Sequence, residues 1–341
     1  MRPQLLATAI VFAIASTSIL ANNNTRVVNQ NGTGNTALGD QSDPTSEGNT
    51  MVQTQNGDNN FSDAAQFNTT LNSTIVHTQI GDNNFSSFLE QEGASNSSIQ
   101  LLQNGDTNEV FAVQFQSQDS NMSLIQQGSG NRSSQVQQWS DQSNSTVFQL
   151  GDLNISTTIQ VLSTSNIGNY VQIGSSNIAL LNTVEASFSQ FNVQQVGMQN
   201  TATTGGGPIN FNSISVSQFG DDNEGSGVQG FIDNSTIDVV QIGSQNEAST
   251  GQSFGEFANT EVLQNGTLNI AFSNGAGSFI QSLTTQFGQQ NDSFHQPFGD
   301  GHIATTFQSG TLNTATTFQN GASQTANITQ LGSSNTGTVN Q

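Results

Sequence analysis

Apolar and polar residues alternate along most of the chain, in short segments separated by glycine and asparagine. The segment Ser143 to Gln160 is representative, because it is typical of a strand, a tight turn at Gly151 and a second strand. Residues two apart on a strand point to the same face. When the glutamine before each turn is taken as inward, its companions on that face are nearly all apolar: Ile99 and Leu101, Met122 and Leu124, Phe191 and Val193, Ile214 and Val216, Ile237 and Val239, and Ala326 and Ile328.

This unit, Ser-x5-Gln-x-Gly-x-x-Asn-x-Ala-x3-Gln, recurs down the chain with its glutamines 22 to 25 residues apart. So regular a period indicates one structural unit stacked many times, because each unit buries its apolar face only against its neighbours. We therefore predict an all-β protein, a β-solenoid of 13 to 14 strand-turn-strand rungs with cross-β stacking. The residues expected to form its ladders and turns are Gln55, Gly57, Asn60, Gln79, Gly81, Asn84, Gln103, Gly105, Asn108, Gln126, Gly128, Asn131, Gln149, Gly151, Asn154, Gln172, Gly174, Asn177, Gln195, Gly197, Asn200, Gln218, Gly220, Asn223, Gln241, Gly243, Asn246, Gln264, Gly266, Asn269, Gln286, Gly288, Asn291, Gln308, Gly310, Asn313, Gln330, Gly332 and Asn335.

The two strands of a unit differ in the size of their inward residues. The second strand carries smaller ones, such as Asn108, Val110, Ala112 and Gln114, or Asn246, Ala248, Thr250 and Gln252. The motif glycine lies between the strands, in a turn that we call the first arc, where positive φ favours glycine. A buried amide side chain costs about 1 to 3 kcal/mol if unpaired, but identical residues about 4.7 Å apart can pair amide to amide.

Several stretches depart from the repeat. Gln91-x-Gly93-x-x-Asn96 and Gln319-x-Gly321 lie halfway between copies, which indicates that the connection to the next rung, the second arc, uses the same turn chemistry. Gly205 to Pro208 lies in another second arc and is predicted to be a loop. Phe294 to Phe298, which includes Pro297, is predicted to be a bulged arc or a weakened rung.

The ends of the chain differ from its repetitive middle. Residues 1–21 combine Arg2 with an apolar run from Leu5 to Leu20 and are predicted to be a secretory signal peptide. Residues 22–48 are rich in asparagine and glycine, and we expect either a degenerate first repeat or a flexible leader there, before a repeat solenoid over residues 49–341. The last residues complete half a unit with Gln341, so we expect open strand edges that template another molecule.

Composition narrows the range of functions. Lys and Arg together number 3 against 24 acidic residues, which gives a net charge of −21 and leaves no basic patch for nucleic acid or an anionic membrane. No cysteine is present, so stability has to come from the ladder rather than from disulfides. His77, His295 and His302 are scattered, and no serine recurs with a histidine partner, so we expect no enzyme, no cofactor and no catalytic metal.

The repeat is similar to the curlin repeat, the unit of the subunits of curli, which are extracellular amyloid fibres of bacterial biofilms. The resemblance covers about residues 49–341. It implies a secreted subunit that polymerises with itself at the surface of a Gram-negative bacterium, for biofilm matrix, adhesion and cell aggregation. As partners it implies a nucleator subunit, a periplasmic chaperone and an outer-membrane secretion channel. The minor nucleator subunit is the alternative within the family, whereas the uniform repeats favour the major subunit.

Aspartate follows the motif glycine in five units, at Asp58, Asp82, Asp106, Asp152 and Asp221. Carboxylates stacked about 4.7 Å apart in successive rungs repel by roughly 0.9 kcal/mol in water. One interpretation is that they are gatekeepers that slow premature aggregation. The other is that a divalent cation such as Ca²⁺ bridges them.

Apolar residues also flank the motif glutamine on the outward face, at Ile125, Phe148, Leu150, Val171, Ile173, Val240, Ile242 and Phe307. This outer stripe is either an interface for bundling or adhesion or a consequence of β propensity alone. The alternative from another functional class is a soluble ice-binding or glycan-binding adhesin with a flat threonine face. It is suggested by the pairs Thr157-Thr158, Thr284-Thr285, Thr305-Thr306 and Thr316-Thr317.

Overall fold

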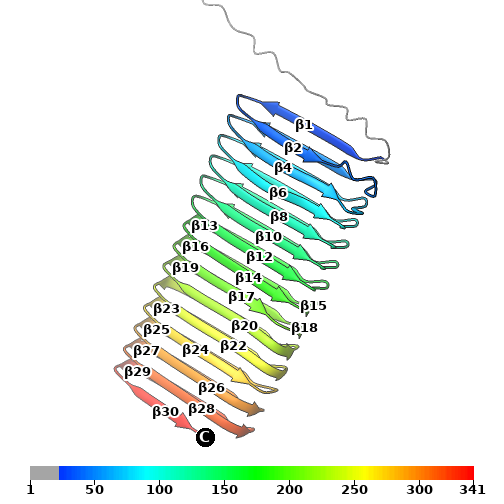
Figure 1. Cartoon of the computed structure of the whole chain (residues 1–341). Helices are drawn as coiled ribbons and strands as arrows, with labels where there is room; N and C mark the ends of the chain where they lie inside the picture. Colours follow the sequence, from blue (N-terminus) through cyan, green and yellow to red (C-terminus); the bar gives the residue numbers. More distant parts are fainter. Residues whose placement is uncertain (1–22) are drawn as a thin grey trace, which may run out of the picture.

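The computed structural model describes residues 23–341, which form an all-β solenoid of stacked rungs without a helix (Figure 1). The predicted signal peptide, residues 1–21, lies outside the described residues. Each rung contributes one strand to each of two sheets, one of 14 strands and one of 16. The predicted fold class is therefore confirmed. Each rung holds two strands and two arcs because a repeat of about 23 residues is long enough for them.

Every strand pairs in parallel with the strand one rung away. The first sheet comprises β1 (Thr25–Asn31), β3 (Thr50–Asn56), β5 (Thr74–Ile80), β7 (Ser98–Asn104), β9 (Asn121–Gln127), β11 (Asn144–Leu150), β13 (Ile167–Ser175), β16 (Gln190–Met198), β19 (Ser213–Asp221), β21 (Thr236–Ser244), β23 (Asn259–Thr267), β25 (Gln281–Gln289), β27 (Ile303–Thr311) and β29 (Thr325–Ser333). The second sheet comprises β2 (Thr36–Asp40), β4 (Phe61–Phe67), β6 (Phe85–Glu92), β8 (Glu109–Phe115), β10 (Arg132–Gln138), β12 (Ile155–Val161), β14 (Ile178–Val184), β17 (Thr201–Gly206), β20 (Glu224–Asp233), β22 (Glu247–Glu256), β24 (Ile270–Ala276), β26 (Asp292–Asp300), β28 (Thr314–Ala322) and β30 (Thr336–Asn340), with the short β15 (Ala186–Ser187) and β18 (Ile209–Asn210).

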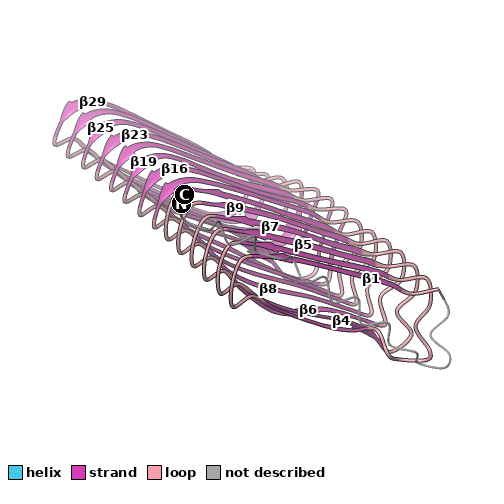
Figure 2. Ribbon diagram, turned by 90° about the horizontal axis from the view of Figure 1, so that it is seen from above, coloured by secondary structure: helices cyan, strands magenta, loops and turns pink. Residues whose placement is uncertain are grey.

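The register keeps identical motif positions above one another. Gln126 in β9 pairs with Gln149 in β11, which pairs with Gln172 in β13. The arcs consequently stack in two rows along the sides of the sheets (Figure 2). Any side chain therefore lies about 4.7 Å from its counterparts in the rungs above and below.

The core lies between the two sheets and follows the predicted parity. Leu101, Leu124 and Val193 of the first sheet and Ala112 and Ala248 of the second are buried, as are the other inward residues named for these strands. The small second-sheet residues make room for large first-sheet ones, of which Tyr170 and Phe191 are the largest fully buried side chains. Glutamine, asparagine and serine are interleaved with them throughout, so the core is mixed rather than purely apolar.

The asparagine- and glycine-rich segment before residue 49, expected to be either a degenerate first repeat or a flexible leader, forms a first rung. β1 and β2 pair in register with β3 and β4. Arg26 stands opposite Met51, at a position that faces inward in later rungs, and its Nη1 donates to the Gly39 carbonyl at 2.9 Å. Arg26 thus holds an inward register position but remains exposed, because it lies in the first described rung.

One local prediction needs correction, and one of the two alternatives for another stretch is excluded. Gly205 and Gly206 are not a loop, because they extend β17 and pair with β14 and β20, so that only Gly207 and Pro208 form the turn. Extended glycine supplies backbone hydrogen bonds as well as any residue, so a glycine run did not have to interrupt the ladder. For Phe294 to Phe298 the bulged alternative is excluded, because β26 is continuous and stays in register.

The rung around Pro297 is weakened only locally. The pairing of β24 with β26 passes from Ser273 opposite His295 to Ala276 opposite Phe298 and omits Gln296 and Pro297 between them. Proline has no N–H to donate. A bulge occurs instead at Phe88 in β6, where the register shifts between Ser87 and Leu89. That extra residue accounts for one of the longer intervals of the repeat.

Candidate functional site

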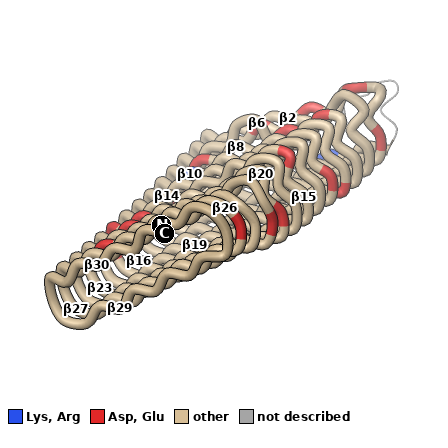
Figure 3. The backbone as a smooth tube through the Cα atoms, turned by 90° about the horizontal axis from the view of Figure 1, so that it is seen from below, with Lys and Arg blue, Asp and Glu red and all other residues tan. Residues whose placement is uncertain are grey.

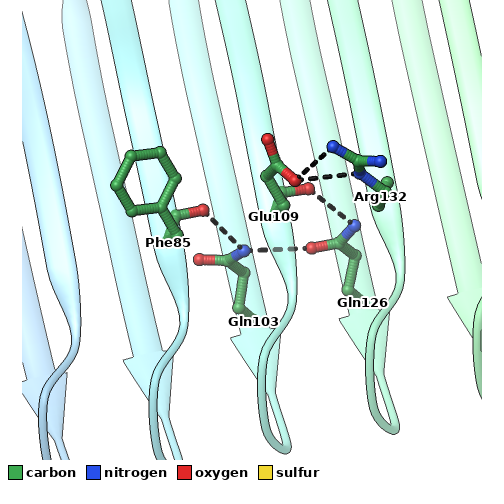
Figure 4. A network of polar contacts seen from close by, with 5 residues as sticks. All are labelled: Phe85, Gln103, Glu109, Gln126 and Arg132. Carbon is green, nitrogen blue, oxygen red and sulfur yellow. Dashed lines mark hydrogen bonds and ion pairs between the residues drawn. The ribbon is translucent and has the colours of Figure 1, made fainter.

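The motif glutamines form one side-chain ladder through the first sheet. From Gln30 to Gln330, each Nε2 donates to Oε1 of the glutamine in the next rung, at 2.6 to 3.1 Å. Most of the same Nε2 groups also donate to a backbone carbonyl of the second sheet, as Gln126 does to Glu109 at 3.3 Å (Figure 4). The ladder therefore joins rung to rung and sheet to sheet, and the predicted amide pairing is present.

A second, interrupted ladder runs through the other sheet, built from the last glutamine of each unit. It is continuous from Gln41 to Gln160, at 2.6 to 2.9 Å. It stops there because Thr183 and then Gly206 occupy the next positions, so within residues 23–341 Gln160 Nε2 has no acceptor. The ladder is present again between Gln229 and Gln252 at 2.8 Å.

The motif asparagines, from Asn60 to Asn335, close the first arcs. In a representative rung, the Asn131 Nδ2 donates to the Gly151 carbonyl of the next rung at 2.7 Å and to Asn108 Oδ1 of the previous rung at 3.1 Å. Its backbone N–H also reaches Asn108 Oδ1, at 3.0 Å. The leading serines of four units, Ser73, Ser97, Ser120 and Ser143, close second arcs in a similar way, as Ser97 Oγ donates to the Ser117 carbonyl of the next rung at 3.1 Å.

The motif glycines, from Gly57 to Gly332, have φ between 100° and 136°, as the turn prediction required. A second constraint was not foreseen. A Cβ on Gly174 would lie 1.9 Å from the carbonyl oxygen of Gly197, and the glycines from Gly57 to Gly310 face the next rung in the same way. The rungs therefore approach each other too closely at this position for any side chain.

The five aspartates after the motif glycines have a structural role that the sequence did not reveal. Asp58, Asp82, Asp106, Asp152 and Asp221 each accept a backbone N–H from the preceding rung, at 2.7 to 2.8 Å. For Asp58, the backbone hydrogen bond from Thr33 lowers the carboxyl pKa. Four of them are exposed on the arcs and Asp221 is half-buried, and acidic residues dominate the charge there (Figure 3).

Gatekeeping and cation bridging both remain predictions for these aspartates. Among residues 23–341, no three His, Asp or Glu side chains come close enough together to hold a metal ion. Each carboxylate has one oxygen bonded to a backbone N–H, and its second oxygen is free of that bond for a bridging cation.

The three histidines do not form a cluster. His77 is buried between Ser62 Oγ at 2.8 Å and Gln103 Oε1 at 3.2 Å. His295 is buried between Ser282 Oγ at 2.8 Å and Thr306 Oγ1 at 2.6 Å. Burial lowers the pKa of each of these two imidazoles to about 4. The two occupy separate rungs and bond across the core.

The outer stripe lies on the outward face of the first sheet. Ile125 and Ile242 are more than one-third exposed and the other six members are half-buried. Leu150, Ile173, Val196, Phe219 and Ile242 stack in five consecutive rungs, but Gln194 and Ser217 interrupt the neighbouring row. The stripe is thus continuous over part of the solenoid only.

The threonine pairs do not make a flat face. In each pair one residue points inward, as Thr158, Thr284, Thr306 and Thr317 are fully buried. The outward members are divided between β12 and β28 of the second sheet and β25 and β27 of the first. The regular array that an ice-binding surface would need is therefore missing from these pairs.

No protein-family model matches the chain. No curated protein sequence matches it either. Within residues 23–341, no helix has the length and apolar character needed to span a membrane.

Proposed function

We propose that this β-solenoid is a structural protein that polymerises end to end into extracellular fibres of the curli type. The observation that carries the proposal is the glutamine ladder, which repeats the same donor-to-acceptor bond at every rung from Gln30 to Gln330. The same bond can join Gln330 Nε2 of one copy to Gln30 Oε1 of the next, together with the backbone bonds of β29 and β1. Strand edges of this kind are templates for pairing with another chain.

The repeat motif supports the biological setting of the proposal. On the curlin likeness, the chain is exported through the periplasm of a Gram-negative bacterium with the help of a chaperone and leaves through an outer-membrane channel. It then polymerises on a nucleator and serves the biofilm matrix, adhesion and aggregation. A role as the major subunit fits the near-uniform rungs, and we propose no catalytic activity.

Dilution of the mature chain from denaturant tests the proposal, with thioflavin fluorescence as the readout. We expect a lag phase that preformed fibres abolish, since an existing end removes the need for nucleation. A stable, β-rich soluble chain that fresh seeds do not convert would contradict polymerisation. It would favour the binding-solenoid alternative, for which glycan binding would then be the activity to assay.

A further inference from the structure

Exposed phenylalanine side chains lie in five successive second arcs between residues 185 and 279, or at the strand ends that lead into them. Neither the ladders nor the outer stripe includes them. We call them the arc phenylalanines, and 49% to 64% of each side chain is exposed: Phe188, Phe211, Phe231, Phe254, Phe257 and Phe279.

The arc phenylalanines adopt a backbone conformation that is unfavourable for bulky residues. All six have φ between 51° and 58°, the left-handed region that costs a bulky residue roughly 1 to 2 kcal/mol. Asn234, which lies in the same row between Phe211 and Phe257, has φ 53°, and Asp119 and Gly301 hold the corresponding position in other rungs. Since small polar residues serve the turn elsewhere, the fold does not require phenylalanine here, and strained residues of this kind cluster at functional positions.

The arc phenylalanines stack along the solenoid axis. Ring centroids are 5.1 Å apart for Phe188 and Phe211, 5.5 Å for Phe231 and Phe254, and 5.3 Å for Phe257 and Phe279, with interplanar angles of 5° to 20°. Each stack covers one face of both rings and leaves the rims exposed. At about 200 Å² per phenylalanine, the three pairs together expose roughly 700 Å², whereas the largest apolar patch of a typical monomer exposes about 300 to 600 Å².

We propose that this phenylalanine ridge is a lateral docking surface for the same ridge on a second copy of the chain. The exposed area approaches the roughly 800 Å² that each partner contributes to a standard interface. Within each stacked pair the rings repeat at the rung spacing, so the pairs can meet the same pairs on a second copy, as in interdigitated side-chain zippers. Single solenoids can pair in this way, so the proposal does not depend on end-to-end assembly.

The salt dependence of binding distinguishes a second copy of the chain from a cationic partner. Asp233 and Glu256 lie within the ridge in adjacent register, and Arg26 and Arg132 are both in distant rungs. Two copies meeting through the ridge bring like charges together, so salt should strengthen their association by screening them. A cationic partner would show the opposite dependence.

The test compares lateral association of the full chain with that of two quadruple variants. The first replaces Phe188, Phe211, Phe257 and Phe279 with asparagine, the residue that Asn234 already supplies in the same row. The control replaces Phe61, Phe85, Phe272 and Phe294, two stacked pairs on the face of the second sheet, with threonine. Dimerisation is measured by sedimentation velocity at about 0.01 M and about 0.5 M salt, and the width of any fibres by electron microscopy.

We expect side-by-side pairing that increases with salt, and at least about 30-fold weaker pairing for the asparagine variant, the loss of one hot-spot residue being a lower bound. The control should pair like the wild type. Equal pairing of the asparagine variant and wild type, or pairing that falls with salt, would overturn the proposal. A single cysteine at Asn234 tests the contact independently, because it should form an intermolecular disulfide, whereas one at Ser129 on the first arcs should not.

Discussion

Replacing Gln172 by leucine should destabilise the solenoid far more than the same change at Gln160, although both glutamines are fully buried. Gln172 donates to Gln195 Oε1 and to the Ile155 carbonyl, both at 2.9 Å, and accepts from Gln149 Nε2 at 2.8 Å. Gln160 accepts one bond, from Gln137 at 2.9 Å, and its own Nε2 has no partner within the described residues. The two sites therefore differ in hydrogen bonding rather than in burial.

The expected magnitudes follow from those bonds. Gln172→Leu removes three hydrogen bonds at about 1 kcal/mol each and leaves Gln195 Oε1 unsatisfied, for a total of about 4 kcal/mol. Gln160→Leu removes one bond together with an unpaired amide, so its cost should be about 1 kcal/mol or less.

The assay is guanidinium unfolding of the soluble chain, followed by far-ultraviolet circular dichroism under identical conditions for both variants. An unchanged m-value would show that the variants unfold from the same structure. Similar losses at the two sites would refute the reasoning, because burial alone would then explain the effect and the ladder would contribute nothing specific.

Four further predictions concern other parts of the solenoid. The folded pKa values of His77 and His295 are about 4, below the unfolded value of about 6.5. The stability that these two histidines contribute should therefore be complete above pH 6.5 and fall towards pH 4, by up to about 3 kcal/mol per histidine. The pH-dependent unfolding of His77→Gln should show half of this loss, and a profile like that of the wild type would contradict the prediction. Gly174→Ala should lower the free energy of unfolding by at least about 1 to 2 kcal/mol from its φ alone. Denaturant unfolding compares it with Gly230→Ala, whose added Cβ meets no atom within 4 Å. Equal effects of the two substitutions would argue against close contact between rungs at Gly174. Changing Phe148, Leu150, Val171 and Ile173 to serine should reduce fibre bundling in electron micrographs if the outer stripe is an interface, and unchanged bundling would leave only β propensity. Millimolar calcium should alter the assembly rate or fibre stability if cations bridge the aspartates, and no change in either would remove that hypothesis.

Periodicity was sufficient to predict the solenoid, the inward face and the glutamine ladder, because a residue that recurs every rung has to meet its own copies. Local geometry was harder to predict. The bulge at Phe88 and the extended Gly205 and Gly206 depend on how neighbouring strands pair, which composition does not determine.

The roles of the arc residues were the least accessible from the sequence. The aspartates reach backbone N–H groups one rung away, so their hydrogen bonds become visible only when the register is known. The phenylalanine ridge alternates between two positions of the arc, with Phe231 and Phe254 in one row and Phe211 and Phe257 in the other. A search for one repeating position therefore does not find it.

Mass per length of the fibres, from scanning transmission electron microscopy, tests the central claim most directly. If 14 rungs stack at about 4.7 Å, a chain of 35.9 kDa occupies about 66 Å, and a single filament should contain about 0.5 kDa per Å. Fibres in which each chain forms one flat layer would contain about 14 times as much mass per length. The lower value, or a small multiple of it in bundles, is what the stacked solenoid predicts, and the higher value in a single filament would contradict it.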